Sequence, residues 1–146
     1  MEILTATLCD SAADYGGKLC LMGAFDTIFA RKFPTMHPQC SIVLRLMMRP
    51  EDIGDHRLQL EFVNPDGHPF IEADRSPNVP FKVEALPENS YFLTKNLIFN
   101  FQGFPVPAPG QYEIRVCIDG VTETIIPLQF IDQRELAEGV GGGLER

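Results

Sequence analysis

The sequence predicts an all-β fold in which about eight or nine short strands form an antiparallel sandwich. Twelve prolines and twelve glycines divide the 146 residues into short segments. Within these segments apolar and polar residues alternate with a period near two, which is typical of strands, and no long helical repeat interrupts them. Many short strands separated by turn residues indicate a sandwich or a barrel.

One tyrosine favours the sandwich. Tyr112 follows Pro109-Gly110-Gln111, directly after the turn that opens the penultimate strand. In immunoglobulin-like domains a tyrosine at this place bonds back to the preceding backbone, an arrangement called the tyrosine corner. We therefore expect an immunoglobulin-like antiparallel β-sandwich in which the Tyr112 hydroxyl is buried and bonded to backbone a few residues upstream. An up-and-down barrel is the alternative.

The strands follow from the alternation, taken in chain order. Residues 40–49 are apolar on nearly both faces, which marks a central strand. Residues 56–63 alternate plainly, with Leu58, Leu60 and Phe62 directed inward. The expected strands are 2–10, 18–30 as one or two strands, 40–49, 56–63, a short return strand at 68–71, 81–86, 91–102, 111–118 and 121–131.

Glycine, proline and short polar side chains mark the connections. Gly16 and Gly17 supply the positive φ angles of a tight reversal, and residues 64–67 have proline and glycine at favoured turn positions. Alternate prolines across residues 104–110 remove the backbone donors that a ladder needs, so this segment is expected to be irregular. The other expected loops contain Pro34 and Pro38 and span residues 50–55, 72–80 and 87–90.

The final hairpin has the strongest local signal. Asp119-Gly120 separates two alternating runs and favours a type I′ turn. Pro127 removes one ladder bond, so part of the last strand is expected at an edge or a bulge. The pattern stops after Ile131, which predicts one sandwich domain over residues 1–131 and a mobile, charged and glycine-rich tail over residues 132–146.

Composition and charge limit the partners. Asp and Glu outnumber Lys and Arg by 20 to 12, which gives a formal charge of −8, and the basic residues do not cluster. Such a chain repels polyanions, so nucleic acids and anionic membranes are not expected partners. The sequence contains no apolar stretch near the ~18 residues of a membrane span and no leader at its start, so we expect a cytoplasmic protein.

The cysteines carry no pattern of a metal or redox site. Cys9, Cys20, Cys40 and Cys117 form no Cys-x-x-Cys pair and have no histidine at ligand spacing. In a reducing compartment such residues act as small apolar side chains. We therefore expect four reduced thiols, no metal and no cofactor.

Short motifs along the chain form a recognisable pattern. They are LCDSA at 8–12, GKL at 17–19, GAFDTI at 23–28, FP at 33–34 with HP at 37–38, PGQY at 109–112 and DG at 119–120. Together they resemble a family of small bacterial proteins known only as a domain of unknown function. The resemblance covers about residues 1–131. It implies a small β-sandwich and no established activity.

Catalytic constellations are not evident. No serine lies in a Gly-x-Ser-x-Gly elbow, and His37, His56 and His68 sit in or beside expected turns, where a solvated imidazole is the ordinary state. Aspartates that end or interrupt the first strands can bind a cation or act as general acid and base, but more commonly accept turn hydrogen bonds. The candidate ligand-site residues are Asp10, Asp26, Arg31 and His37.

Two functional hypotheses follow. The first is a non-catalytic binding module that presents loops or a sheet face to a protein partner or to a second copy. It rests on a second apolar set that includes Val43, Met47, Ile98, Ile125 and Ile131 and lies opposite the expected inward set. In the competing arrangement, loops 72–80 and 104–109 cover this face. The second hypothesis is an enzyme or small-ligand protein that uses the four candidate residues.

Overall fold

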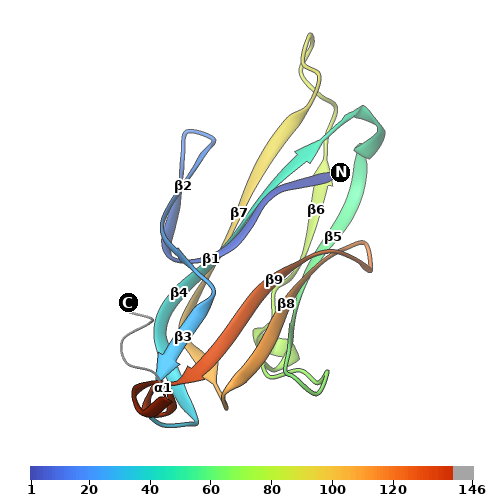
Figure 1. The fold of residues 1–146 in the computed structure, drawn as a ribbon. Helices are drawn as coiled ribbons and strands as arrows, with labels where there is room; N and C mark the ends of the chain where they lie inside the picture. The colour runs from blue at the N-terminus through green and yellow to red at the C-terminus, as the bar shows by residue number, and fades with distance from the viewer. Residues whose placement is uncertain (140–146) are drawn as a thin grey trace.

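The protein is almost entirely β-structure in a computed structural model that describes residues 1–139 (Figure 1). Two single-turn 3-10 helices, at Pro50–Asp52 and Ala73–Arg75, interrupt the strands. The elements are β1 (Glu2–Tyr15), β2 (Lys18–Phe25), β3 (Thr27–Ala30), β4 (Thr35–Met48), β5 (Gly54–Val63), β6 (Asn78–Val83), β7 (Leu93–Val106), β8 (Gly110–Ile118), β9 (Val121–Asp132) and α1 (Gln133–Gly139).

The strands form two sheets. Sheet A has the order β2-β1-β4-β7, and sheet B has the order β3-β9-β8-β5-β6. Neighbouring strands run antiparallel, except that β3 runs parallel to β9. Sheet B curls strongly, so that it has the shape of a half-barrel around the core (Figure 1). The prediction of an all-β fold is confirmed.

The core lies between the two sheets. Alternate residues of the paired strands point into it, among them Ile42 of β4, Leu60 and Phe62 of β5 and Ile114 of β8. Each fully buried side chain of this size contributes about 1.5–3 kcal/mol. Phenylalanines fill the part of the core around Phe62. Their rings pack edge to face in a cluster of Phe62, Phe70, Phe101 and Phe104.

The hairpin of β1 and β2 folds back over the outer face of sheet A. Arg45 lies on that face, because its neighbours in β4 point inward, and its guanidinium donates a 3.0 Å hydrogen bond to the carbonyl of Gly17 at the hairpin tip. The amide of Asn96 in β7 donates to Asp14 at 2.9 Å and to the same carbonyl at 3.2 Å. Val43 is also on this outer side of β4, outside the core cluster, and is 0% exposed.

The pairing of β1 with β2 is interrupted at Gly23. The register passes from Cys9↔Ala24 to Ser11↔Met22 without a pair between Asp10 and Gly23. Gly23 has a φ of +70°, and a Cβ at this position would lie 2.8 Å from Cγ of Asp10. Only glycine therefore allows the Asp10 carboxylate to lie against the strand.

The final hairpin and the tyrosine prediction are confirmed. Asp119 and Gly120 have φ angles of +52° and +82°, as a type I′ turn requires. Tyr112 is 3% exposed, and its hydroxyl donates a 2.9 Å hydrogen bond to the carbonyl of Ala108. Strand β9 pairs with β3 only from Gln129 onward. Pro127 precedes this pairing, so at Pro127 strand β9 has a neighbour on one side only, β8.

The effect of proline on the strands was predicted wrongly at several places. Pro38 lies inside β4 rather than in a loop, and Pro105 lies inside β7, so the segment expected to be irregular is paired up to Val106. Strand β6 includes Pro80 and begins at Asn78 instead of residue 81. Strands β6 and β7 are outermost in their sheets, where a missing N–H costs no ladder bond.

Two further segments differ from expectation. The return strand at 68–71 is reduced to one bridge between Val63 and Pro69. Strand β9 includes Asp132, and the chain continues as helix α1 where no regular structure was expected. The rest of the expected tail, residues 140–146, lies outside the described residues.

Candidate functional site

The structure does not bring the four candidate residues together. Asp10 is exposed at the bend of the hairpin, beside Gly23. Asp26 is also exposed, and its Oδ1 accepts a 2.7 Å hydrogen bond from the hydroxyl of Thr27. Its backbone carbonyl accepts the N–H of Gln129, which joins the start of β3 to β9. These contacts resemble the hydrogen bonds that aspartate ordinarily makes at strand ends.

Arg31 and His37 do share one hollow. Both line an open depression of about 500 Å³ between the end of β3 and the start of β4, together with Lys32, Met36 and Val106. His37 is half-buried and packs against Phe25, with ring centroids 5.5 Å apart. Two cations and an imidazole without a carboxylate do not form an acid-base pair.

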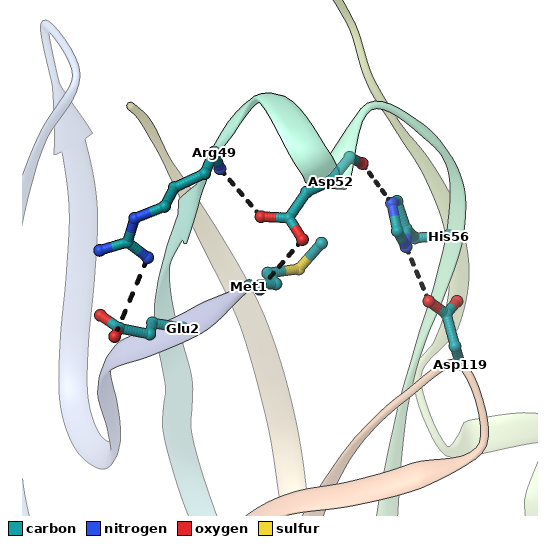
Figure 2. A network of polar contacts seen from close by, with 6 residues as sticks. All are labelled: Met1, Glu2, Arg49, Asp52, His56 and Asp119. Atoms are coloured by element: carbon teal, nitrogen blue, oxygen red, sulfur yellow. Dashed lines mark hydrogen bonds and ion pairs between the residues drawn. The ribbon is translucent and has the colours of Figure 1, made fainter. Parts of the chain in front are cut away.

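A polar network joins the β4–β5 connection to the turn between β8 and β9 (Figure 2). His56 lies between Asp119 and Asp52: Nδ1 is 2.7 Å from Oδ2 of Asp119, and Nε2 is 2.6 Å from the carbonyl of Asp52. The Asp52 carboxylate accepts the backbone N–H of Arg49 at 2.8 Å and the amino group of Met1 at 3.0 Å. Every group in this chain therefore has a partner within the fold.

The network favours the charged form of His56. Both ring nitrogens face acceptors, and only the imidazolium donates from both. The hydrogen bond to Asp119, followed by that to the Asp52 carbonyl, raises the pKa of His56, while the same imidazole lowers the pKa of Asp119. Since both nitrogens are occupied, His56 is structural rather than available as a base, and the expectation of a solvated ring is wrong for this histidine.

Three cysteines are buried and one is exposed. Cys9, Cys40 and Cys117 are buried, and burial raises the pKa of Cys40 to about 12. Cys20 is exposed in β2. Within residues 1–139 no group of three or more His, Cys, Asp and Glu side chains has the arrangement of a metal site.

The outward face of the β1–β2 hairpin exposes two large hydrophobic side chains. In the hairpin register Ser11, Ala13 and Tyr15 stand beside Met22, Cys20 and Lys18 on one face, and all six are exposed. Tyr15 is 76% exposed and Met22 is 73% exposed. The residues of the opposite face, Ala12, Leu19 and Leu21, are half-buried toward sheet A.

This surface was not predicted from the sequence. The first strand was expected to end at residue 10, whereas β1 continues to Tyr15. Continuing the alternation of residues 2–10 through Ser11, Ala13 and Tyr15 provides the missing signal. Exposed apolar side chains on one face of a regular hairpin are informative because such surfaces can mark an interaction site.

These features define an all-β protein of two sheets whose conspicuous surface is an apolar hairpin face. The chain matches the family of unknown function DUF6941 over residues 4–131 and belongs to that family. The predicted resemblance to an uncharacterised family is thereby confirmed. No curated protein and no solved structure matches the chain. Among the described helices none has the length and apolar character needed to cross a membrane.

Proposed function

We propose that this protein is a non-catalytic interaction module that binds another protein through the outward face of its β1–β2 hairpin. The observation that carries the proposal is the exposure of Tyr15 and Met22 on one face of a hairpin whose other face packs on sheet A. Large apolar side chains gathered on a regular surface tend to mark protein contacts, and tyrosine and methionine are enriched there.

The anchoring of the hairpin supports this role. The bonds from Arg45 and Asn96 to Gly17 hold the tip against sheet A, so the outward face is presented by a fixed ribbon. A surface that is already ordered loses less conformational entropy when a partner binds. The outer face of sheet B is a weaker candidate because it carries charges, such as Glu113 and Arg115, which pair with each other at 3.0 Å.

The strand order supports an immunoglobulin-like fold for this module. In immunoglobulin domains one sheet contains strands A, B and E and the other contains C, F and G, with C′ added in the variable type. The orders β1-β4-β7 and β9-β8-β5-β6 correspond to A-B-E and G-F-C-C′, and the Tyr112 bond corresponds to the tyrosine corner. We infer one immunoglobulin-like domain over residues 1–131. The free cysteines are compatible with a bacterial cytoplasm.

Affinity capture with matched variants tests the proposal. The double variant Tyr15→Ser/Met22→Ser removes the apolar face without touching the core. Tyr91→Ser/Ile53→Ser is the control, because these side chains are 86% and 51% exposed outside the hairpin. We expect proteins that the wild type and the control retain from a lysate of the native cells to be lost with the hairpin variant. Identical capture by all three proteins would refute the role of the hairpin.

A further inference from the structure

Strand β2 is an unprotected edge of sheet A. Edge strands usually carry prolines or charges, or are very short, because their unpaired backbone groups otherwise pair with other chains. Strand β6 has Pro80 and Lys82, β7 has Lys95 and Pro105, and β3 has four residues. Between residues 19 and 25, β2 contains neither a proline nor a charge. It is therefore the outer strand best suited to pair with another strand.

The hairpin turn determines which backbone groups of β2 are directed outward. Tyr15 and Lys18 flank the two-residue turn and pair with each other. Because the bonding direction alternates along an antiparallel strand, the N–H and C=O groups of Leu19 and Leu21 point away from β1. The pairing with β1 is interrupted at Gly23, which has a positive φ, so the regular stretch ends there. Two residues thus offer four backbone groups to a partner strand.

We propose that two copies of the chain associate by antiparallel pairing of their β2 edges, an inference that rests on the proposed function of the hairpin. A strand antiparallel to its own copy obeys a twofold axis, which is the commonest symmetry of protein dimers. Pairing Leu19 with the partner's Leu21 satisfies all four outward groups of each copy. Cys20 then stands opposite the partner's Cys20, at a non-hydrogen-bonded position with Cα atoms about 4.5 Å apart.

The charges of the hairpin fit a second copy. The chain as a whole carries a formal charge of −8, but the outward hairpin face has one cation, Lys18, and no carboxylate. In the proposed register Lys18 lies opposite the partner's Met22, and the two Lys18 side chains stand at opposite ends of the paired segment. The two hairpin faces therefore bring no carboxylates together, although the chain as a whole is strongly acidic.

Sedimentation of the full chain over a range of micromolar concentrations tests the pairing. We expect a reversible monomer–dimer equilibrium for the wild type and for Ile125→Lys, which places a charge on the outer face of sheet B. Cys20→Lys puts two cations face to face and is expected to shift the chain to the monomer. Cys20 is exposed, and circular dichroism verifies that each variant is folded.

Oxidation reports on the register. Diamide removes two electrons and two protons from a pair of thiols, which leaves one S–S bond and converts diamide to its hydrazine. We expect rapid formation of a covalent dimer that Cys20→Ser abolishes. A wild type that is monomeric at all concentrations, or a dimer unaffected by Cys20→Lys, would overturn the pairing. If the Tyr15→Ser/Met22→Ser variant still loses captured proteins in that case, the proposed function stands without the dimer.

Discussion

The hydroxyl of Tyr112 in β8 donates its hydrogen bond to the carbonyl of Ala108, four positions earlier in the chain. This bond fixes the loop between β7 and β8 to the start of β8. Tyr112→Phe keeps the buried ring and removes the bond, so we expect the free energy of unfolding to fall by about 1 kcal/mol. Urea denaturation measures the change. Tyr91→Phe, in an exposed loop, serves as the control, and equal stability of Tyr112→Phe and wild type would contradict the assignment.

Thiol reactivity separates the four cysteines. We expect a disulfide reagent to modify one thiol, that of Cys20, in the native protein at low concentration and all four after denaturation. The pKa of about 12 for Cys40 and the raised pKa of Cys9, both due chiefly to burial, keep these thiols in the unreactive protonated form. Cys20→Ser is expected to abolish native labelling. Two or more rapidly labelled thiols would show that a buried cysteine is accessible.

The His56–Asp119 pair makes stability depend on pH. The pKa of His56 is raised on folding, so its contribution is complete below the unfolded value of about 6.5 and is lost as pH rises through the folded pKa. The pKa of Asp119 is lowered, so its contribution is present above the unfolded value of about 3.9 and is lost at lower pH. The pair therefore stabilises the fold most between these limits.

His56→Gln tests this dependence by thermal unfolding at a series of pH values. We expect the variant to lose about 1 kcal/mol or less near pH 5.5 and progressively less as pH rises above 6.5. His68→Gln provides the comparison, because His68 is exposed in a turn and its substitution is expected to leave the profile unchanged. A constant difference between His56→Gln and wild type at every pH would argue against a charged imidazole.

The contact between Asp10 and Gly23 predicts a coupled pair of substitutions. Gly23→Ala combines an unfavourable positive φ with a Cβ close to the Asp10 side chain, so we expect a loss of about 1–2 kcal/mol or more. Gly16→Ala has a similar φ of +60° but open space around its Cβ. It therefore reports the backbone term alone.

A double-mutant cycle isolates the steric part of that loss. Asp10→Ala shortens the side chain against which the new Cβ packs, so Gly23→Ala is expected to cost less in this background than in the wild type. Denaturant unfolding of the four proteins gives the coupling. If the costs of Gly23→Ala and Gly16→Ala are equal and independent of residue 10, the close approach of residues 10 and 23 has no energetic consequence.

Local patterns were sufficient to predict much of the fold. The alternation around Leu58, Leu60 and Phe62, the Asp119-Gly120 turn and the Tyr112 bond all depend on residues that are near in sequence or fixed by one strand period. The errors at Pro38, Pro80 and Pro105 have a different origin. Pro80 and Pro105 lie in the outermost strands β6 and β7, and Pro38 lies in a part of β4 that precedes its pairing with β1 at Ser41. No local pattern reveals which side of a strand lacks a neighbouring strand.

The candidate surface depended on contacts that are distant in sequence. Arg45 and Gly17 are 28 positions apart, and Asp14 and Asn96 are 82 positions apart. Val43, a member of the second apolar set, is fully buried, so this part of the outer face of sheet A is not open to a partner. The four candidate residues were selected because the aspartates end or interrupt the first strands, whose ends can converge at one end of a sandwich. In the structure Arg31 and His37 line one depression, whereas Asp10 lies beside Gly23.

The fold-back of the hairpin links solubility to recognition. A two-stranded ribbon has only two faces, and here Leu19 and Leu21 are half-buried on one face, which leaves Tyr15 and Met22 exposed on the other. Substitutions at the hairpin tip therefore affect both properties. Loss of the Arg45–Gly17 bond exposes a sheet prone to aggregation, and it also releases the hairpin that carries the binding face. Selection against insoluble variants is expected to preserve the partner surface even in lineages that no longer use it.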